Sequence, residues 1–305
     1  MFIYGIKQLG KNASTEASCH CKNTKIQHCG LFNIMTTMLE KPATSADYFN
    51  ASQINRVYGL NLKEPESLSF SDEEMATAKR LGMVTVLFTD KNAKGEPLTG
   101  KAMCDQFGNE LRERVEGQKL EGEEKFFCDT ATWYQEQPLF TLETPAPGYG
   151  QLTRIHIPDS TSKTYLDQTG VIAKYVRDQI YDGEELPETC GQAIEEYKTK
   201  RDFLEALTMA NRREGIKQSV ALRLNQMFRP TAVELMYVAP LFYRANGEYL
   251  LPEMWTWTKS LSLNGGIANV GCGSSRGMRV VVLGPPWFLS SELGVIILRR
   301  PLARS

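Results

Sequence analysis

Cysteine and histidine side chains gather in one short stretch of the sequence. Cys19-His20-Cys21 and His28-Cys29 hold three of the seven cysteines and two of the three histidines. Thiolate and imidazole are preferred zinc ligands, so Cys19, Cys21, His28 and Cys29 could form a zinc site. The C-x-C spacing crowds a tetrahedral site, however, and no second knuckle follows. We therefore favour a flexible tail of reduced thiols without a cofactor; a zinc-ribbon protein that binds nucleic acid is one alternative.

A further cysteine, Cys272, lies in the glycine-rich run Gly271–Gly277 and is a conceivable nucleophile. No histidine or second cysteine lies near it in the sequence, and His156, the one histidine outside the cluster, is expected to be structural. The glycine-rich run also lacks the Lys-Ser/Thr pair and the following helix of a phosphate-binding loop. We expect no enzyme activity, and an enzyme that uses Cys272 is the alternative.

The window from Ser260 to Ser291 has an unusual composition. Lys, Glu and Gln make up 57 of the 305 residues, so about 6 are expected in 32 positions, yet the window contains none. Randomising the two adenines of an asparagine codon cannot produce these three residue types. It can produce nearly all residues of the window, and only Met278 and Trp287 lie outside that set. A glycine- and serine-rich β segment without long polar side chains is the simpler interpretation.

The same region carries a family resemblance. The segments Asn246-Gly247-Glu248-x-Leu250-Leu251-Pro252, Trp255-Thr256-Trp257-Thr258 and Leu293-Gly294-Val295 bracket this variegated stretch. Together they resemble the C-terminal domain of the variable proteins of diversity-generating retroelements, over roughly Pro230 to Arg300. The resemblance implies a C-type lectin fold of the formylglycine-generating-enzyme type, a bacterial or phage source, and a hypervariable surface that binds a ligand. Met278 and Trp287 depart from simple asparagine-codon variation.

We expect the variable surface to recognise a protein or another macromolecule. Arg, Trp and exposed Phe side chains most often anchor interfaces, and surface substitutions are tolerated because they change stability little. Trp255, Trp257, Gly294 and Val295 are assigned to the scaffold. The predicted ligand contacts are Ile267, Asn269, Cys272, Ser274, Arg276, Arg279, Trp287, Phe288 and Leu289.

The elements that must position these residues indicate an α+β protein, with a helical and mixed N-terminal scaffold before the lectin-like domain. Ser71 and Glu74 form a capping box, as do Thr231 and Glu234, and Pro240 is expected to kink or end the second helix.

We divide the chain into residues 1–40 (tail), 41–158 (mixed α/β), 159–229 (helical) and 230–305 (ligand-binding). The expected helices are Ser67–Gly82, Leu98–Leu111, Ser160–Ile180, Gly191–Asn211, Val220–Arg229 and one from Thr231; the expected strands are Val84–Phe88, a pair in Phe126–Leu142, Leu152–Ile157, Trp255–Thr258 and Leu293–Ile297.

Composition limits the broad class of the protein. Of 305 residues, 42% are apolar and 23% are charged, which is typical of a globular chain. The chain shows no apolar run long enough to span a membrane and no signal-peptide pattern, so the cytoplasm is the expected location. The net charge of −1 argues against a general nucleic-acid binder. Met254–Ser305, however, has six basic residues and one acidic residue, a formal charge of +5, which leaves nucleic acid as a disfavoured partner.

Overall fold

The computed structural model describes residues 47–66, 70–110, 127–128, 136–182, 184–274, 277–282 and 286–301. Cys19, Cys21, His28 and Cys29 lie outside these ranges, so the zinc site and the reduced-thiol tail both stay predictions. Arg276 lies outside them as well.

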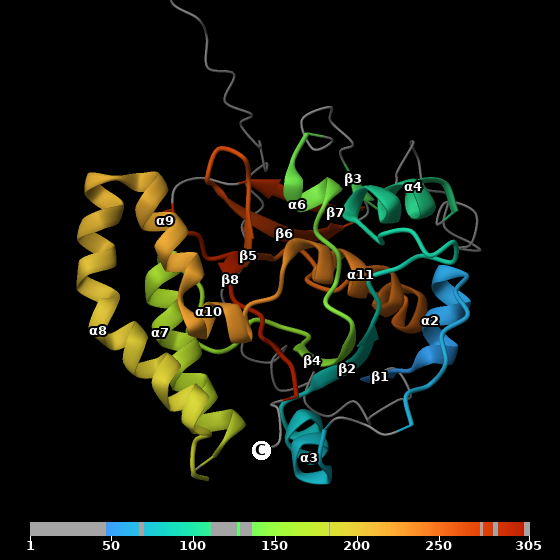
Figure 1. Cartoon of the computed structure of the whole chain (residues 1–305), viewed down its shortest axis with the longest axis horizontal. Helices are drawn as coiled ribbons and strands as arrows, with labels where there is room; N and C mark the ends of the chain where they lie inside the picture. Colours follow the sequence, from blue (N-terminus) through green and yellow to red (C-terminus); the bar gives the residue numbers. More distant parts are fainter. Residues whose placement is uncertain are drawn as a thin grey trace, which may run out of the picture. The chain divides into compact units, whose positions relative to one another are not determined.

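A four-stranded sheet forms one part of the fold (Figure 1). Its order is β1 (Tyr48–Phe49), β2 (Met83–Phe88), β4 (Gly148–Thr153) and β9 (Leu298–Arg299). Strand β1 is parallel to β2, whereas β4 is antiparallel to both β2 and β9. The strand expected at Leu152–Ile157 lies earlier, at Gly148–Thr153, where the chain pairs with all six residues of β2. All six residues of β2 are buried, which agrees with a sequence that is apolar except for Thr85 and confirms the strand expected there.

A five-stranded sheet contains most of the C-terminal region. Its order is β3 (Phe127–Cys128), β7 (Gly277–Val282), β6 (Ile267–Ser274), β5 (Trp255–Leu261) and β8 (Leu293–Gly294). Strands β5, β6 and β7 are consecutive and antiparallel. Strand β8 pairs in parallel with β5, with Trp255 opposite Leu293. The strand expected at Leu293–Ile297 ends at Gly294, because the next three amides donate to the side-chain hydroxyls of Ser160, Thr256 and Thr153 and not to the backbone carbonyls of a neighbouring strand.

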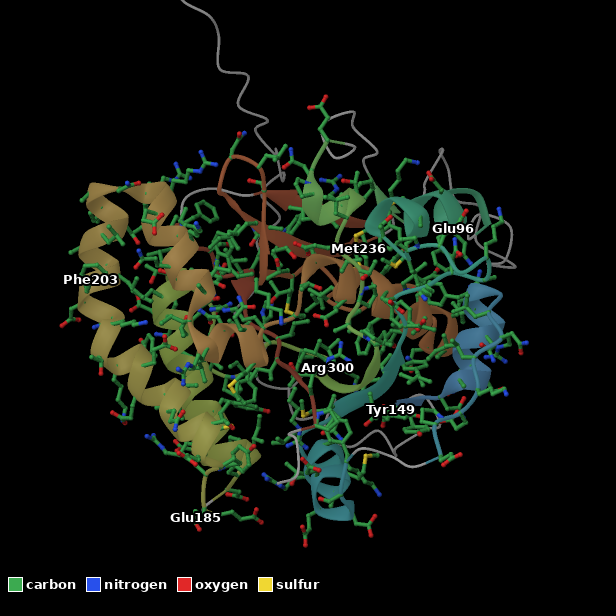
Figure 2. The ribbon with its side chains drawn as sticks, viewed as in Figure 1. Glu96, Tyr149, Glu185, Phe203, Met236 and Arg300 are labelled. Atoms are coloured by element: carbon green, nitrogen blue, oxygen red, sulfur yellow. The ribbon has the colours of Figure 1, made fainter. Side chains whose placement is uncertain are left out.

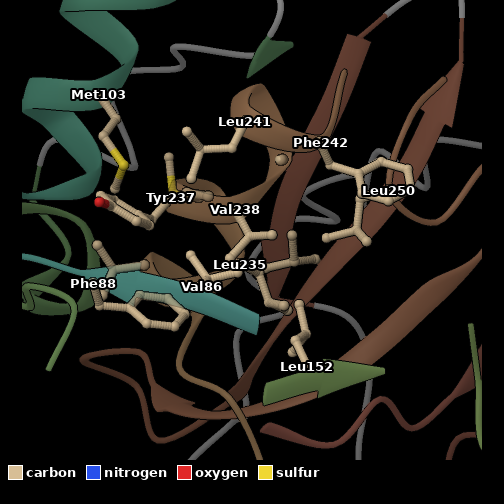
Figure 3. Packing of buried hydrophobic residues seen from close by; sticks show 14 of the residues in the cluster. Val86, Phe88, Met103, Leu152, Leu235, Tyr237, Val238, Leu241, Phe242 and Leu250 are labelled. Carbon is tan, nitrogen blue, oxygen red and sulfur yellow. The ribbon is translucent and has the colours of Figure 1, made fainter. Parts of the chain in front are cut away.

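Helix α11 (Ala232–Asn246) packs between the two sheets and contacts β2 on one side and β6 on the other (Figures 1 and 3). The predicted capping box is present, because Thr231 accepts from the amide of Glu234 and the Glu234 side chain accepts from the amide of Thr231. The helix does not end at Pro240. The buried residues Leu241 and Phe242 follow it, and their packing against the core holds the backbone helical despite the missing N–H.

Shorter helices complete this core. Helices α2 (Ala51–Tyr58) and α4 (Gly100–Glu110) pack against α11, and α3 (Asp72–Arg80) packs against β2. The Ser71–Glu74 capping box of α3 is confirmed. Residues Pro138–Thr141 form the helical turn α6 and not the expected strand, since Pro138 occupies the first turn and donates no hydrogen bond to a strand partner.

A helical layer packs around a second apolar cluster. It consists of α7 (Tyr165–Tyr175), the π-helical turn η2 (Val176–Ile180), α8 (Glu188–Ala210), α9 (Arg212–Ala221) and α10 (Arg223–Phe228). The helix expected at Val220–Arg229 is divided, because Leu222 has a non-helical backbone conformation with ψ of 132°. Val295 and Ile297, between β8 and β9, belong to this cluster too.

These observations establish an α+β protein. Residues 43–305 form one compact unit, so the described parts of the segments 41–158, 159–229 and 230–305 share their packing. None of the described helices combines the length and apolarity needed to span a bilayer.

Candidate ligand-binding surface

One face of the five-stranded sheet carries several of the predicted contacts. Trp257 lies opposite Asn269, and Gly271 lies opposite both Trp255 and Arg279. Because directly opposed residues point to the same side and side chains alternate along a strand, Trp255, Trp257, Asn269 and Arg279 share one face. The opposite face, with Val270 and its neighbours, packs toward α11.

Helices cover the part of this face around Trp257. Ile267 packs in a cluster with Tyr165 of α7 and Ile216 of α9 and is 1% exposed. Asn269 is 0% exposed, and neither atom of its amide group hydrogen-bonds to a partner in the described part of the chain. These two predicted contacts therefore lie in the interior, where a ligand cannot reach them in this conformation. Arg279 is partly exposed.

Trp287, Phe288 and Leu289 form an exposed apolar segment. Their exposed fractions are 41%, 42% and 56%. The backbone is fixed on either side of them, because Tyr165 donates its amide N–H to Pro286 O at 2.8 Å and Ser162 donates to Ser290 O at 2.9 Å. Three large apolar side chains are thus held in contact with solvent by an anchored loop. Contiguous exposed apolar groups of this kind often mark binding sites.

The corner between α8 and α9 extends this segment. The guanidinium carbon of Arg212 lies 5.3 Å from the centroid of the Trp287 ring, a cation–π contact. Met209, at the end of α8, is 76% exposed and lines a pocket with Trp287. We call Met209, Arg212, Trp287, Phe288 and Leu289 the corner surface.

The turn between β5 and β6 also reaches the α8–α9 corner. Arg213, next to Arg212, donates from Nη2 to Leu263 O at 3.3 Å, and Leu263 is 53% exposed.

Sequence reasoning missed Met209 and Arg212 because they lie outside the window of unusual composition. One feature of the sequence could have indicated Met209. The buried face of α8 includes Ile194 and Leu204, and the apolar Met209 does not lie on that face.

The remaining predicted contacts are less defined. Cys272 and Ser274 lie in β6, but their side chains fall outside what the structure describes. The alternative of an enzyme that uses Cys272 therefore remains a hypothesis. Across the described residues, no group of three or more His, Cys, Asp or Glu side chains is arranged to hold a metal ion.

His156 has a structural position. Its Nε2 lies 2.8 Å from Trp255 O, and burial lowers the pKa of the imidazole to about 4, with the backbone hydrogen bond opposing this shift. The ring packs so closely on β8 that a Cβ added at Gly294 would lie 2.5 Å from His156 Cγ. His156 is therefore neutral at pH 7 and joins the loop after β4 to the five-stranded sheet.

Comparisons with protein-family models, with curated proteins and with solved structures give no match.

Proposed function

We propose that this protein is a ligand-binding protein whose corner surface recognises another protein. The observation that carries the proposal is the anchored, solvent-exposed run Trp287-Phe288-Leu289. Tryptophan and arginine are enriched among interface residues that contribute most to affinity, and Arg212 lies directly against Trp287. A loop with fixed ends also loses little conformational entropy on binding.

The apolar character of the surface favours a protein over a nucleic acid. Three of its five residues are consecutive large apolar side chains, and Met209 adds a fourth. Nucleic-acid surfaces depend mainly on clustered Lys and Arg, which contact phosphates. Arg212 is the single basic residue among the five.

Peptide selection tests the proposal directly. Random peptides displayed on phage are selected on the immobilised full chain and then counter-screened against a variant with Trp287, Phe288 and Leu289 all replaced by Ser. The matched control replaces Leu142 and Ile155 by Ser, because these apolar side chains are also exposed, at 75% and 47%. We expect clones that bind the wild type and the control but not the triple variant. Clones that bind all three proteins equally, or a failure to enrich any clone, would contradict the proposal.

We further propose that the window Ser260–Ser291 is diversified by a retroelement. Its lack of Lys, Glu and Gln supports this, as does the position of Trp287–Leu289 within it. Sequencing the DNA that flanks the gene should find a reverse-transcriptase gene and a near-copy of the window that differs mainly at adenines. Flanks without either would remove the retroelement part and leave the binding proposal standing.

A further inference from the structure

A pocket lies beside Trp287, where the first turn of α7 meets the last turns of α8. Its lining is mainly apolar and includes Leu166, Met209 and Trp287. Two carboxylates, of Asp167 and Glu205, also line it, and none of the described lining residues is Lys, Arg or His. The pocket therefore joins an apolar wall to an acidic edge.

The two carboxylates differ in their partners. Asp167 is already engaged, because its Oδ1 lies 3.1 Å from Arg201 Nη2 and its Oδ2 accepts from Thr164 Oγ1 at 2.7 Å. Glu205 is exposed and forms no hydrogen bond or ion pair within the described ranges. Arg212 contacts the Trp287 ring but does not line the pocket. The hydrogen bond with Asp167 raises the pKa of the Arg201 guanidinium, and the charge of Glu205, one turn later on α8, adds to this shift, but the Arg201 and Glu205 side chains form no ion pair. A ligand that enters the pocket therefore meets Glu205 as the carboxylate without a direct partner among the described residues.

We propose that this pocket receives a lysine or arginine side chain of the partner protein, a deepening that rests on the proposed function. Long basic side chains combine an apolar stem with a charged end and commonly pack the stem on apolar surface while the charge stays near water. The stem would pack against Leu166, Met209 and Trp287, and the cation would pair with Glu205.

The test uses the full chain and capped tripeptides Ac-Gly-X-Gly-NH2, in which X is Lys, Arg, Glu or Leu. Saturation-transfer NMR measures binding, and titration gives each dissociation constant. The Lys and Arg peptides should bind, and Glu205→Gln should weaken them at least about fivefold because the pairing charge is lost. Glu185→Gln is the matched control. Glu185 is also exposed, and it lies at the opposite end of the helical layer from Phe203, which is two positions before Glu205 in α8 (Figure 2). It should leave binding unchanged.

Two results would overturn the inference. Binding of the Lys and Arg peptides that is absent, or unaffected by Glu205→Gln, would remove the basic side chain as the occupant. Tighter binding of the Leu or Glu peptide would assign the pocket to an apolar or acidic group. In either case, phage clones that depend on Trp287-Phe288-Leu289 would still support the corner surface, whereas failure of that selection is a failure of the proposed function.

Discussion

Two leucines four positions apart give a stringent test of which C-terminal residues face solvent. Leu289 is 56% exposed in the corner surface, whereas Leu293 is 1% exposed in β8. Replacing each by Ala removes the same atoms, so the two variants differ only in their surroundings. A buried Leu→Ala substitution costs roughly 2–5 kcal/mol of unfolding free energy, because a cavity adds to the lost transfer free energy. For Leu289, which retains less than half of its surface in contact with protein, the cost should be under about 1 kcal/mol.

Thermal unfolding measures this difference. In a unit of this size, 1 kcal/mol shifts Tm by roughly 2–4 °C. Leu293→Ala at about 3 kcal/mol should therefore lower Tm by roughly 6–12 °C, and Leu289→Ala by less than about 4 °C. Circular dichroism of both variants and the wild type under one buffer and scan rate gives the comparison. Equal decreases would show that Leu289 is packed in the native state, and the corner surface would then lose its main support.

Three further predictions concern the interior. Burial lowers the folded-state pKa of His156 to about 4, below the unfolded value. Its contribution to stability is therefore complete above about pH 6.5 and falls by roughly 1.4 kcal/mol per pH unit toward pH 4. Urea unfolding should show this slope in the difference between the wild type and His156→Gln, and a difference that does not change with pH would contradict it. Gly294→Ala should lower Tm by several degrees, because its Cβ would lie 2.5 Å from His156 Cγ, and an unchanged Tm would mean that the ring can move. Arg229→Ala should lower the free energy of unfolding by about 3 kcal/mol in urea unfolding, because the buried guanidinium donates to Asn225 Oδ1 at 2.8 Å and to Tyr165 O at 3.0 Å. A decrease below about 1 kcal/mol would show that water replaces the guanidinium in the variant.

Local signals in the sequence predicted local structure well. The capping boxes at Ser71 and Thr231 depend on contacts three residues apart, and both are present. The apolar run of β2 was sufficient to predict a buried strand. In each case, the physical cause lies within a few residues, so it can be recognised without knowledge of the fold.

The candidate site depended on distant contacts and was predicted less completely. Alternation along β6 can place Ile267 and Asn269 on one face. The burial of Ile267, however, depends on α7 and α9, which come about 50 or more residues earlier. Similarly, Met209 lies beside Trp287 because the chain at Pro286 hydrogen-bonds to Tyr165 at the start of α7. This contact between distant segments cannot be recognised from the sequence around Met209. Trp287, Phe288 and Leu289 were predicted as contacts because they lie in the window of unusual composition and because Trp and exposed Phe side chains often anchor interfaces. All three are exposed.

The short segment Leu293–Arg299 has a consequence for synthesis of the protein. Leu293 packs with Trp257, Val295 and Ile297 pack with the helical layer, and Ile296 and Leu298 pack with α11. This segment also pairs with β5 through β8 and with β4 through β9. During translation, all the other described helices and strands are made before Leu298 and Arg299 of β9. The nascent chain consequently keeps the cluster around Trp257 incomplete until Leu293 is made, the cluster of the helical layer until Ile297, and the cluster around α11 until Leu298. Chaperones that shield apolar surface can bind these clusters during that interval.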